Sequence, residues 1–537
     1  MENSATTLNL ASLITHHARQ APDKEAIVMN DVRLTYGQLD ALSNRVANAL
    51  VEMGIGHDDK VALLCPNLPF FPIIYYGIMK AGAVVVPLNC LFKARELVYH
   101  LSDSDAKAVF VFEGTDELPM AKTAKEAIEQ VPTCERLIVI TKDPTAESPI
   151  AGHETLTQIT FDKSEKFEAY STRPDDTCSI LYTSGTTGQP KGAELTHFNI
   201  YMNSIAAYSL HLPVIDFTDG EQLTCLITLP LFHTTGQTVQ MNSSMYGGMR
   251  AVLLPRFEPK AMLEAMAREK VNFWIGVPAM YWAILKYIDE TGFDVAPIVE
   301  NLKVPTSGGA PMPVELIQRF DKIFGLRVLE GYGLTETSPI ACFNQFEKPS
   351  KPGTVGQPLM GIEIKCFDDD DNEVERGRSG EIVIRGHNVM KGYYKRPEAT
   401  AEAFRSGWFH TGDIGVIDDE GYLSIVDRKK DMILRGGYNV YPRELEEVII
   451  THPAVSICAV IGVPDERLGE EVKAFVVLKQ GARMTEQEMI AWCKTQFAAN
   501  KYPRYVEFRD NLPIGATGKI FKRALKEEAV ATIGKQG

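Results

Sequence analysis

The sequence predicts an α/β protein with a large N-terminal domain of α/β subdomains plus a small antiparallel β unit, followed by a small α+β C-terminal domain. From residue 10 to about 330, helical periods alternate with short β-branched runs, a pattern typical of parallel sheets with crossover helices. Closely spaced strand patterns follow at 353–427, and a charged run at 427–431 then interrupts them. At 537 residues the chain is also too long for a single hydrophobic core.

The large domain is expected to contain short buried strands with helices between them. β-branched runs predict strands at 60–64, 84–86, 109–112 and 137–140. The most apolar window, 69–88, holds Lys80 in its middle and contains three prolines. It is therefore expected to form a helix that ends near Gly82 and a strand at 83–86, and not a membrane-spanning helix.

The antiparallel unit and the C-terminal domain have predicted elements of their own. In the antiparallel unit these are two strands and a hairpin, at 362–367, 381–385 and 415–426. Behind the charged run, Pro442 and Glu444 fit the first turn of a helix. Two strands, a helix and a last strand are predicted at 455–461, 472–479, 485–498 and 505–509. These patterns divide the chain into an N-terminal domain, a hinge and a C-terminal domain at 1–426, 427–430 and 431–537.

Composition and charge exclude several classes of protein. Lysine and arginine number 55 against 70 aspartates and glutamates, and the net charge of −15 argues against a nucleic-acid binder. The nine cysteines are odd in number and form no CxxC pair, which favours a reducing compartment over a disulfide framework or a zinc site. No signal peptide or lipidation pattern is found. We therefore expect a cytoplasmic protein without a membrane span, and peripheral membrane association stays open.

Residues 183–191 read TSGTTGQPK and follow an apolar run at 179–182 that predicts a strand. Two glycines and four hydroxyl side chains would let backbone N–H groups and hydroxyls surround a phosphate, with Lys191 adding a positive charge. The spacing is not that of a Walker A loop, because Gly192 follows Lys191 and the next helix is expected only near Thr196. Taken alone, such a cluster is more often a surface turn.

Further motifs accompany this loop along the chain. They read LPLFH at 229–233, SGGAP at 307–311, EGYGLTETS at 330–338, GEIVIRG at 380–386, GWFHTGD at 407–413, DRKKD at 427–431, GGYNVYP at 436–442 and LPIGATGK at 512–519. Their order and spacing closely resemble the adenylate-forming (AMP-binding) superfamily, which includes acyl-CoA synthetases, the adenylation domains of peptide synthetases and beetle luciferases. The resemblance covers about residues 10–525.

The resemblance implies a two-step reaction that uses ATP, Mg²⁺ and coenzyme A. A carboxylate attacks the α-phosphate of ATP to give an acyl-adenylate and pyrophosphate, and a thiol then displaces AMP. Because two anions must approach each other, positioning and cations are expected to supply most of the rate. The resemblance also implies that the small α+β C-terminal domain is mobile and turns about the hinge between the two steps.

Four residues carry the chemistry by this resemblance: Lys519, Glu336, Thr186 and His233. Lys519 bridges the attacking carboxylate and the α-phosphate, Glu336 is the Mg²⁺ ligand, and His233 is an aromatic gate near the acyl carboxylate. Thr186 belongs to the phosphate loop. Apart from the resemblance, Lys519 reads as a solvated surface charge, Glu336 as a carboxylate at a helix N-terminus and His233 as a structural residue.

The nucleotide-binding residues implied by the resemblance form several groups. The phosphates contact Thr183, Ser184, Gly185, Thr186, Thr187, Gly188, Lys191 and Thr335. The adenine pocket is formed by Gly308, Gly309, Ala310, Gly331 and Tyr332, and the neighbouring Glu330 and Gly333 are also assigned to cofactor binding. Asp413 is assigned to the ribose hydroxyls and Arg428 to a second contact with the ribose or a phosphate. Lys430 is assigned to the hinge, and Gly436 and Gly437 to the wall beside pantetheine. Read alone, Tyr332 fits core packing and Asp413 fits a turn.

The substrate is inferred from the residues around His233. The segment Thr234 to Gln237, which follows His233, consists mostly of small residues, and Gly308 and Gly333 add no side chain to the expected wall of the acyl pocket. The pocket is therefore expected to accept an extended acyl or aryl group. The segment LPLFHTTGQ at 229–237 resembles that of fatty acyl-CoA ligases more than that of aryl-CoA ligases. This resemblance favours a medium- or long-chain fatty acid, with an aryl-CoA ligase of the 4-coumarate type as the alternative. A catalytically silent nucleotide-binding protein of the same fold is the alternative from another class. Free coenzyme A is the simpler acceptor, a separate carrier protein stays open, and so does the choice between monomer and homodimer.

Overall fold

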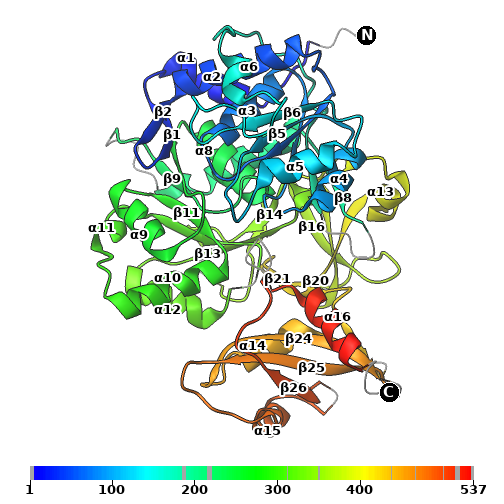
Figure 1. The fold of residues 1–537 in the computed structure, drawn as a ribbon. Coiled ribbons are helices and arrows are strands. Elements are labelled where there is room, and N and C mark those ends of the chain that lie inside the picture. Colours follow the sequence, from blue (N-terminus) through cyan, green and yellow to red (C-terminus); the bar gives the residue numbers. More distant parts are fainter. Residues whose placement is uncertain are drawn as a thin grey trace.

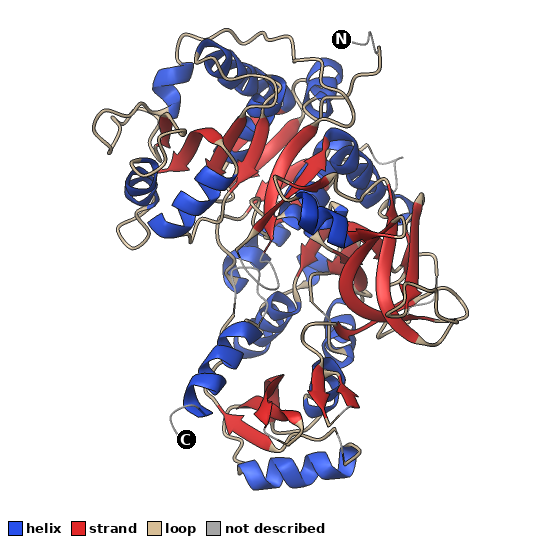
Figure 2. Cartoon of the chain, turned by 90° about the vertical axis from the view of Figure 1, so that its right-hand side faces the viewer, coloured by secondary structure: helices blue, strands red, loops and turns tan. Residues whose placement is uncertain are grey.

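The computed structural model describes residues 5–183, 189–214, 220–310, 312–348, 351–436, 438–465, 467–499, 501–514 and 520–533. Figure 1 shows the C-terminal elements, coloured orange to red, as a smaller body below the rest of the molecule. Figure 2 shows helices around the strands of the larger body. No helix in the described part of the chain is long and apolar enough to cross a membrane.

One large sheet has seven strands in the order β18-β8-β7-β4-β3-β5-β6. Its parallel strands are β3 (Lys60–Leu64), β4 (Val84–Pro87), β5 (Ala106–Phe112), β6 (Arg136–Ile140) and β7 (Thr177–Thr183). Two antiparallel strands complete one edge, β8 (Lys191–Thr196) and β18 (Gly392–Tyr393). The strands expected from β-branched runs are confirmed, since such runs are buried on both faces of a parallel sheet.

The second large sheet has nine strands in the order β15-β14-β13-β12-β11-β9-β10-β1-β2. The parallel strands are β1 (Glu25–Met29), β9 (Thr224–Ile227), β10 (Arg250–Leu253), β11 (Phe273–Gly276), β12 (Val304–Ser307) and β13 (Leu329–Gly333). Antiparallel strands close both edges, with β2 (Val32–Thr35) on one side and β14 (Ile340–Phe343) and β15 (Gln357–Pro358) on the other.

The third sheet is antiparallel, as the close strand spacing predicts. Its strands are β16 (Ile362–Phe367), β17 (Ser379–Gly386), β19 (Phe404–Arg405), β20 (Trp408–Ile417) and β21 (Leu423–Arg428). The predicted hairpin is formed by β20 and β21. Strand β21 continues through Arg428 and so includes the first two residues of the charged run, because Arg428 pairs with Asp413 across the hairpin.

The C-terminal sheet contains β22 (Ile433–Arg435), β23 (Tyr438–Val440), β24 (Val455–Asp465), β25 (Gly469–Leu478) and β26 (Tyr505–Phe508). Both long strands extend beyond their predicted limits, since β24 and β25 form one antiparallel ribbon. The helices beside this sheet are α14 (Pro442–Ile449), α15 (Glu486–Gln496) and α16 (Lys522–Ile533). A separate hydrophobic core lies inside this body, with Val460, Val472 and Ala474 fully buried.

The helices of the larger body are bounded as follows: α1 (Ser12–Gln20), α2 (Tyr36–Glu52), α3 (Phe70–Lys80), α4 (Ala94–Asp103), α5 (Met120–Ile128), α6 (Leu156–Thr160), α7 (His197–Ser209), α8 (Ser243–Tyr246), α9 (Pro259–Arg268), α10 (Pro278–Thr291), α11 (Ala296–Val299), α12 (Val314–Phe324) and α13 (Pro397–Ala403). Helix α3 ends two residues before Gly82, as predicted. Helix α7 begins directly after Thr196, whose side chain accepts from the N–H of Asn199, so the predicted start is confirmed.

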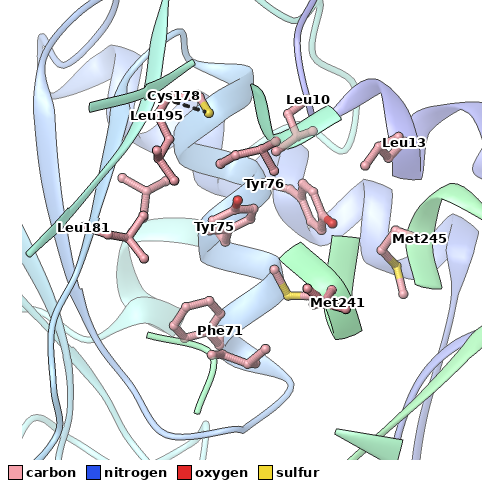
Figure 3. Packing of buried hydrophobic residues seen from close by; sticks show 14 of the residues in the cluster. Leu10, Leu13, Phe71, Tyr75, Tyr76, Cys178, Leu181, Leu195, Met241 and Met245 are labelled. Atoms are coloured by element: carbon pink, nitrogen blue, oxygen red, sulfur yellow. Dashed lines mark hydrogen bonds between the residues drawn. The ribbon is translucent and has the colours of Figure 1, made fainter. Parts of the chain in front are cut away.

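The largest core cluster joins both large sheets. Figure 3 shows its centre, where Tyr75 and Tyr76 of α3 lie near Met241. Met241 belongs to a π-helix, Thr235–Asn242, that follows the predicted gate residue His233. The hydroxyl of Tyr76 donates to Asn242 Oδ1 at 2.7 Å. The segment that carries His233 is therefore fixed in the middle of the molecule by a buried polar contact within an apolar core.

Candidate functional site

Strands β7 and β8 flank the predicted phosphate loop. Thr183 ends β7, Lys191 begins β8, and the two residues face each other across the antiparallel pair. The hydroxyl of Tyr99 donates to the carbonyl of Pro190 at 2.6 Å, which fixes the entry to β8. The loop residues Ser184, Gly185, Thr186, Thr187 and Gly188 lie outside the described residues.

Glu336 lies in a short 3₁₀ turn, Thr335–Thr337, and only 8% of the residue is exposed. Its Oε1 accepts two hydrogen bonds, from the Thr183 hydroxyl at 3.2 Å and from the Tyr393 hydroxyl at 3.0 Å. Its backbone carbonyl accepts from the N–H of Met390 at 2.9 Å. The structure thus brings together two predicted site residues, Glu336 and Thr183, and adds Tyr393, which the sequence analysis does not identify.

Tyr393 also contacts Lys191, whose Nζ lies 4.5 Å from the centre of the Tyr393 ring. This geometry is that of a cation–π contact. The only sequence feature that could point to this residue is the adjacent pair of aromatic residues, Tyr393-Tyr394, after Gly392. Without a contact map that signal does not distinguish Tyr393 from Tyr394, whose hydroxyl instead donates to Asp105 at 2.7 Å.

A second polar cluster surrounds Asp413 in β20. The Tyr332 hydroxyl donates to Asp413 Oδ2 at 2.6 Å, and Arg428 Nε lies 3.4 Å from Oδ1. Asp413 is 5% exposed. Burial, and then the charge of Asp413, raises the pKa of Tyr332, so its phenol stays a hydrogen-bond donor at neutral pH. Three residues predicted to contact the nucleoside are therefore adjacent in space.

The glycine-rich turn after β12 runs beside β13, because Ser307 and Glu330 are paired across these strands. Gly309 has a φ of +77°, which favours glycine, and Ala310 follows it. A Cβ at Gly308 would lie 3.7 Å from the carbonyl oxygen of Gly331, so this glycine is not required by packing. At Gly333 a Cβ would overlap the Pro339 carbonyl oxygen, which gives that glycine a structural reason independent of any ligand.

Glu330 accepts a hydrogen bond from the N–H of Met312 at 3.1 Å and is 8% exposed. Burial raises the pKa of Glu330 to about 7. The carboxyl group therefore faces the turn that follows Ala310, and it links this turn to the strand that carries Tyr332.

His233 is half-buried at the turn that precedes the π-helix, and its carbonyl accepts from the N–H of Gln237 at 3.0 Å. Several buried polar atoms of this stretch, on Thr234, Gln237 and Thr238, have no hydrogen-bond partner in the described part of the chain. π-helical turns are frequent at functional sites. The small residues of this stretch are evident in the sequence, but the π-helix is not predicted from it, because the spacing of its apolar residues does not indicate a π-helical period.

The predicted hinge lies directly behind β21. Lys430 is exposed in a turn after Arg428, and the N–H of Lys429 donates to the Gly412 carbonyl at 2.8 Å. In the C-terminal body, Gly436 follows β22 with a φ of +58°, and a Cβ there would lie 3.1 Å from Leu468. The predicted residues Gly437 and Lys519 lie outside the described residues.

The donor set fits a Mg²⁺–nucleotide complex better than a metal cage built by the protein alone. Among the described residues no group of three or more His, Cys, Asp or Glu could hold a metal. Glu336 presents one carboxylate whose Oε1 is occupied by two hydroxyls, and these contacts do not use Oε2. Mg²⁺ is commonly held by one or two carboxylates together with substrate phosphates and water.

Comparisons with known proteins show which family the sequence and the fold resemble. The AMP-binding enzyme family model matches residues 14–394, and the AMP-binding enzyme C-terminal domain model matches residues 444–519. The chain is 36% identical to a long-chain-fatty-acid–CoA ligase of Bacillus subtilis (strain 168), over 97% of this chain and 94% of the relative. It is also 36% identical to a feruloyl-CoA synthase of Amycolatopsis sp, over 96% and 97%. The crystal structure of ATP-bound MatB from Rhodopseudomonas palustris matches with a TM-score of 0.86 at 32% identity, over 96% of this chain and 98% of that one.

Proposed function

The chain belongs to the AMP-binding enzyme family, and from this membership we propose that it is an ATP-dependent acyl-CoA synthetase. It activates a carboxylic acid as acyl-AMP with release of pyrophosphate, and then transfers the acyl group to coenzyme A with release of AMP. The proposal rests on one observation: a single short segment contributes one residue to each of two polar clusters, the one around Asp413 and the one around Glu336. Tyr332, bonded to Asp413, and Glu336, bonded to Thr183, are four residues apart, so one turn connects a nucleoside end to a phosphate end.

The described residues have the following proposed roles. Asp413 accepts the ribose hydroxyls, with Arg428 beside it. Thr183 and Lys191 stand at the two ends of the phosphate loop, and Glu336 holds Mg²⁺, which when bound neutralises charge on the phosphate oxygens. Buried, pre-oriented groups of this kind lose little free energy to rearrangement during the reaction, which is why they stabilise developing charge effectively.

We further propose that the acid is a medium- or long-chain fatty acid. Two features support this choice, the small residues Thr234 and Thr235 that follow His233 in the sequence and the name of the Bacillus subtilis relative. The feruloyl-CoA synthase relative at the same identity keeps an aryl acid as the second candidate. A cytoplasmic location is also proposed, because nine free, buried cysteines suit a reducing compartment.

Acid-dependent exchange of pyrophosphate into ATP tests the first half-reaction directly. The purified protein is supplied with Mg²⁺, ATP and one acid at a time, from octanoate to palmitate and including ferulate and 4-coumarate. AMP release on addition of coenzyme A then tests the second half-reaction. Exchange with fatty acids in preference to aryl acids is the expected result. No exchange with any acid would sink the proposed function and favour a silent nucleotide-binding protein.

Lys519 is proposed as the residue that bridges the two reacting anions. Lys519→Ala should slow acyl-adenylate formation by about 10²–10³-fold, because one pre-oriented cation is removed from the transition state. Thioester formation from pre-made acyl-adenylate should be largely unchanged. Lys526→Ala is a matched control, since Lys526 is a half-exposed lysine of α16 that pairs with Glu470. Equal loss of both half-reactions in Lys519→Ala would reject the assigned role.

A further inference from the structure

We propose that Tyr393 is a positioning residue that orients the metal-binding carboxylate of Glu336 and couples it to Lys191 at the phosphate loop. The inference rests on the proposed function, since it deepens the assignment of Glu336. The residue lies in β18, far from both partners in the sequence, and the motifs that predict the site do not include it. The structure alone brings the three side chains together.

The two hydroxyl donors of Tyr393 and Thr183 both end on Oε1 of Glu336, at 3.0 Å and 3.2 Å. The two donors come from distant parts of the sequence, β7 and β18, and together they hold the carboxylate group in one orientation. Neither bond uses Oε2. A metal-bound carboxylate that is held by an outer hydrogen bond needs no reorientation when the cation arrives, and loss of such a partner typically costs about 10–100-fold in metal affinity.

The backbone of β18 fixes Tyr393 itself. Gly392 pairs with Glu194 across the antiparallel edge, and the N–H of Tyr394 donates to the Gly192 carbonyl at 2.8 Å. On the other side, the N–H of Met390 donates to the backbone carbonyl of Glu336 at 2.9 Å. The segment 390–394, which carries Tyr393, is thus held by backbone bonds both to β8 and to the turn of Glu336, and the N–H of Tyr393 itself donates to Thr400 Oγ1 at 2.9 Å.

The ring of Tyr393 has a second role that its hydroxyl does not share. Lys191 Nζ lies 4.5 Å from the ring centre, so the ring holds the ammonium group beside the phosphate loop while the hydroxyl holds the carboxylate. Tyr393→Phe therefore removes the contact to the carboxylate and keeps the contact to the ammonium group.

The test measures metal affinity without turnover. Mn²⁺ binding to the complex of the full-length protein with α,β-methylene-ATP is followed by electron paramagnetic resonance, in the absence of any acid. Tyr393→Phe keeps the ring and should weaken Mn²⁺ binding about 10-fold. Thr183→Val removes the other donor to Oε1 and should weaken it as well. Tyr394→Phe is the matched control, because its hydroxyl bonds Asp105 and should leave the affinity unchanged.

A second readout separates positioning from a general loss of structure. In the exchange assay Tyr393→Phe should raise the Mg²⁺ concentration for half-maximal rate about 10-fold, while the rate at saturating Mg²⁺ stays close to that of the wild type. Wild-type Mn²⁺ affinity in Tyr393→Phe would overturn the inference, as would a rate that saturating Mg²⁺ fails to restore. Absence of exchange in the wild-type protein would instead count against the proposed function.

Discussion

Lys80 is an unusual residue, a lysine inside the most apolar helix of the chain. Its side chain is 2% exposed, and its ammonium group lies 2.7 Å from Asp40 Oδ1, 2.7 Å from Asn44 Oδ1 and 2.8 Å from Ser43 Oγ. These acceptors all lie on α2, so Lys80 connects α3 to α2. Burial lowers the pKa of Lys80 to about 8, with Asp40 opposing that shift.

The depressed pKa predicts a particular dependence of stability on pH. Between about pH 8 and pH 10.5 the folded chain has released the Lys80 proton, whereas the unfolded chain still holds it. The unfolded state then binds more protons, so stability rises with pH through this window. The free energy of unfolding of the wild type relative to Lys80→Met should therefore increase by up to roughly 3 kcal/mol, measured by urea denaturation. Lys125 forms an exposed ion pair with Glu129, so the same comparison with Lys125→Met should show no such increase. If the difference in unfolding free energy between the wild type and Lys80→Met did not change with pH, the lowered pKa of Lys80 would be contradicted.

At the scale of single residues, the sequence identifies candidate site residues but not their contacts. Glu336 and Asp413 are predicted from motif position, and the structure gives each a half-buried hydroxyl partner, Tyr393 and Tyr332. Tyr332 is in a predicted motif and Tyr393 is not. The difference has a physical cause, because the pairing of Tyr393 with Glu336 depends on how β18 joins the sheet edge, a long-range event that local pattern does not encode.

At the scale of elements, the parallel strands β3 to β6 and the start of α7 are predicted from local pattern, but β8 is not. Its residues, Lys191–Thr196, include glycine, alanine and glutamate, which have low β-propensity. They form a strand because β7 supplies a paired edge, so tertiary context overrides propensity. The start of α7 is different, since it is stabilised locally by a capping box that Thr196 and Asn199 form within the first turn.

Two capping boxes, one in each body, allow the elements to be compared. The Thr196 hydroxyl accepts from the N–H of Asn199 at 3.1 Å, and the Thr485 hydroxyl accepts from the N–H of Glu488 at 3.3 Å. Removing either cap should cost about 1 kcal/mol. Thr196→Ala should lower the protection of α7 amides and Thr485→Ala that of α15 amides, as measured by hydrogen exchange in urea. If Thr485→Ala lowered protection equally in both bodies, the two would unfold as one unit.

At the scale of the whole molecule, the C-terminal body has its own core and is joined to the third sheet through Asp427. The two carboxylate oxygens of Asp427 accept from the N–H of Arg428 at 2.7 Å and from the N–H of Arg443 at 2.8 Å. Arg443 lies in the first turn of α14, where a carboxylate is favoured by unpaired N–H groups. One residue at the end of β21 therefore anchors the helix that begins the C-terminal body, beside the predicted hinge.

The predicted hinge at Lys430 leads to a prediction for each of the two half-reactions. The N–H of Lys430 makes no hydrogen bond in the described part of the chain, and its φ is not among the positive values, so proline removes no backbone bond there but restricts rotation. Lys430→Pro should leave acyl-adenylate formation close to normal and slow thioester formation on the order of 10²-fold, since misplacement of reacting groups costs that much. Lys430→Ala removes the same charge and keeps the backbone free, so it should retain both steps. Single-turnover kinetics of each half-reaction provide the measurement. If the proline and alanine variants formed thioester equally fast, rotation about Lys430 would not separate the two steps.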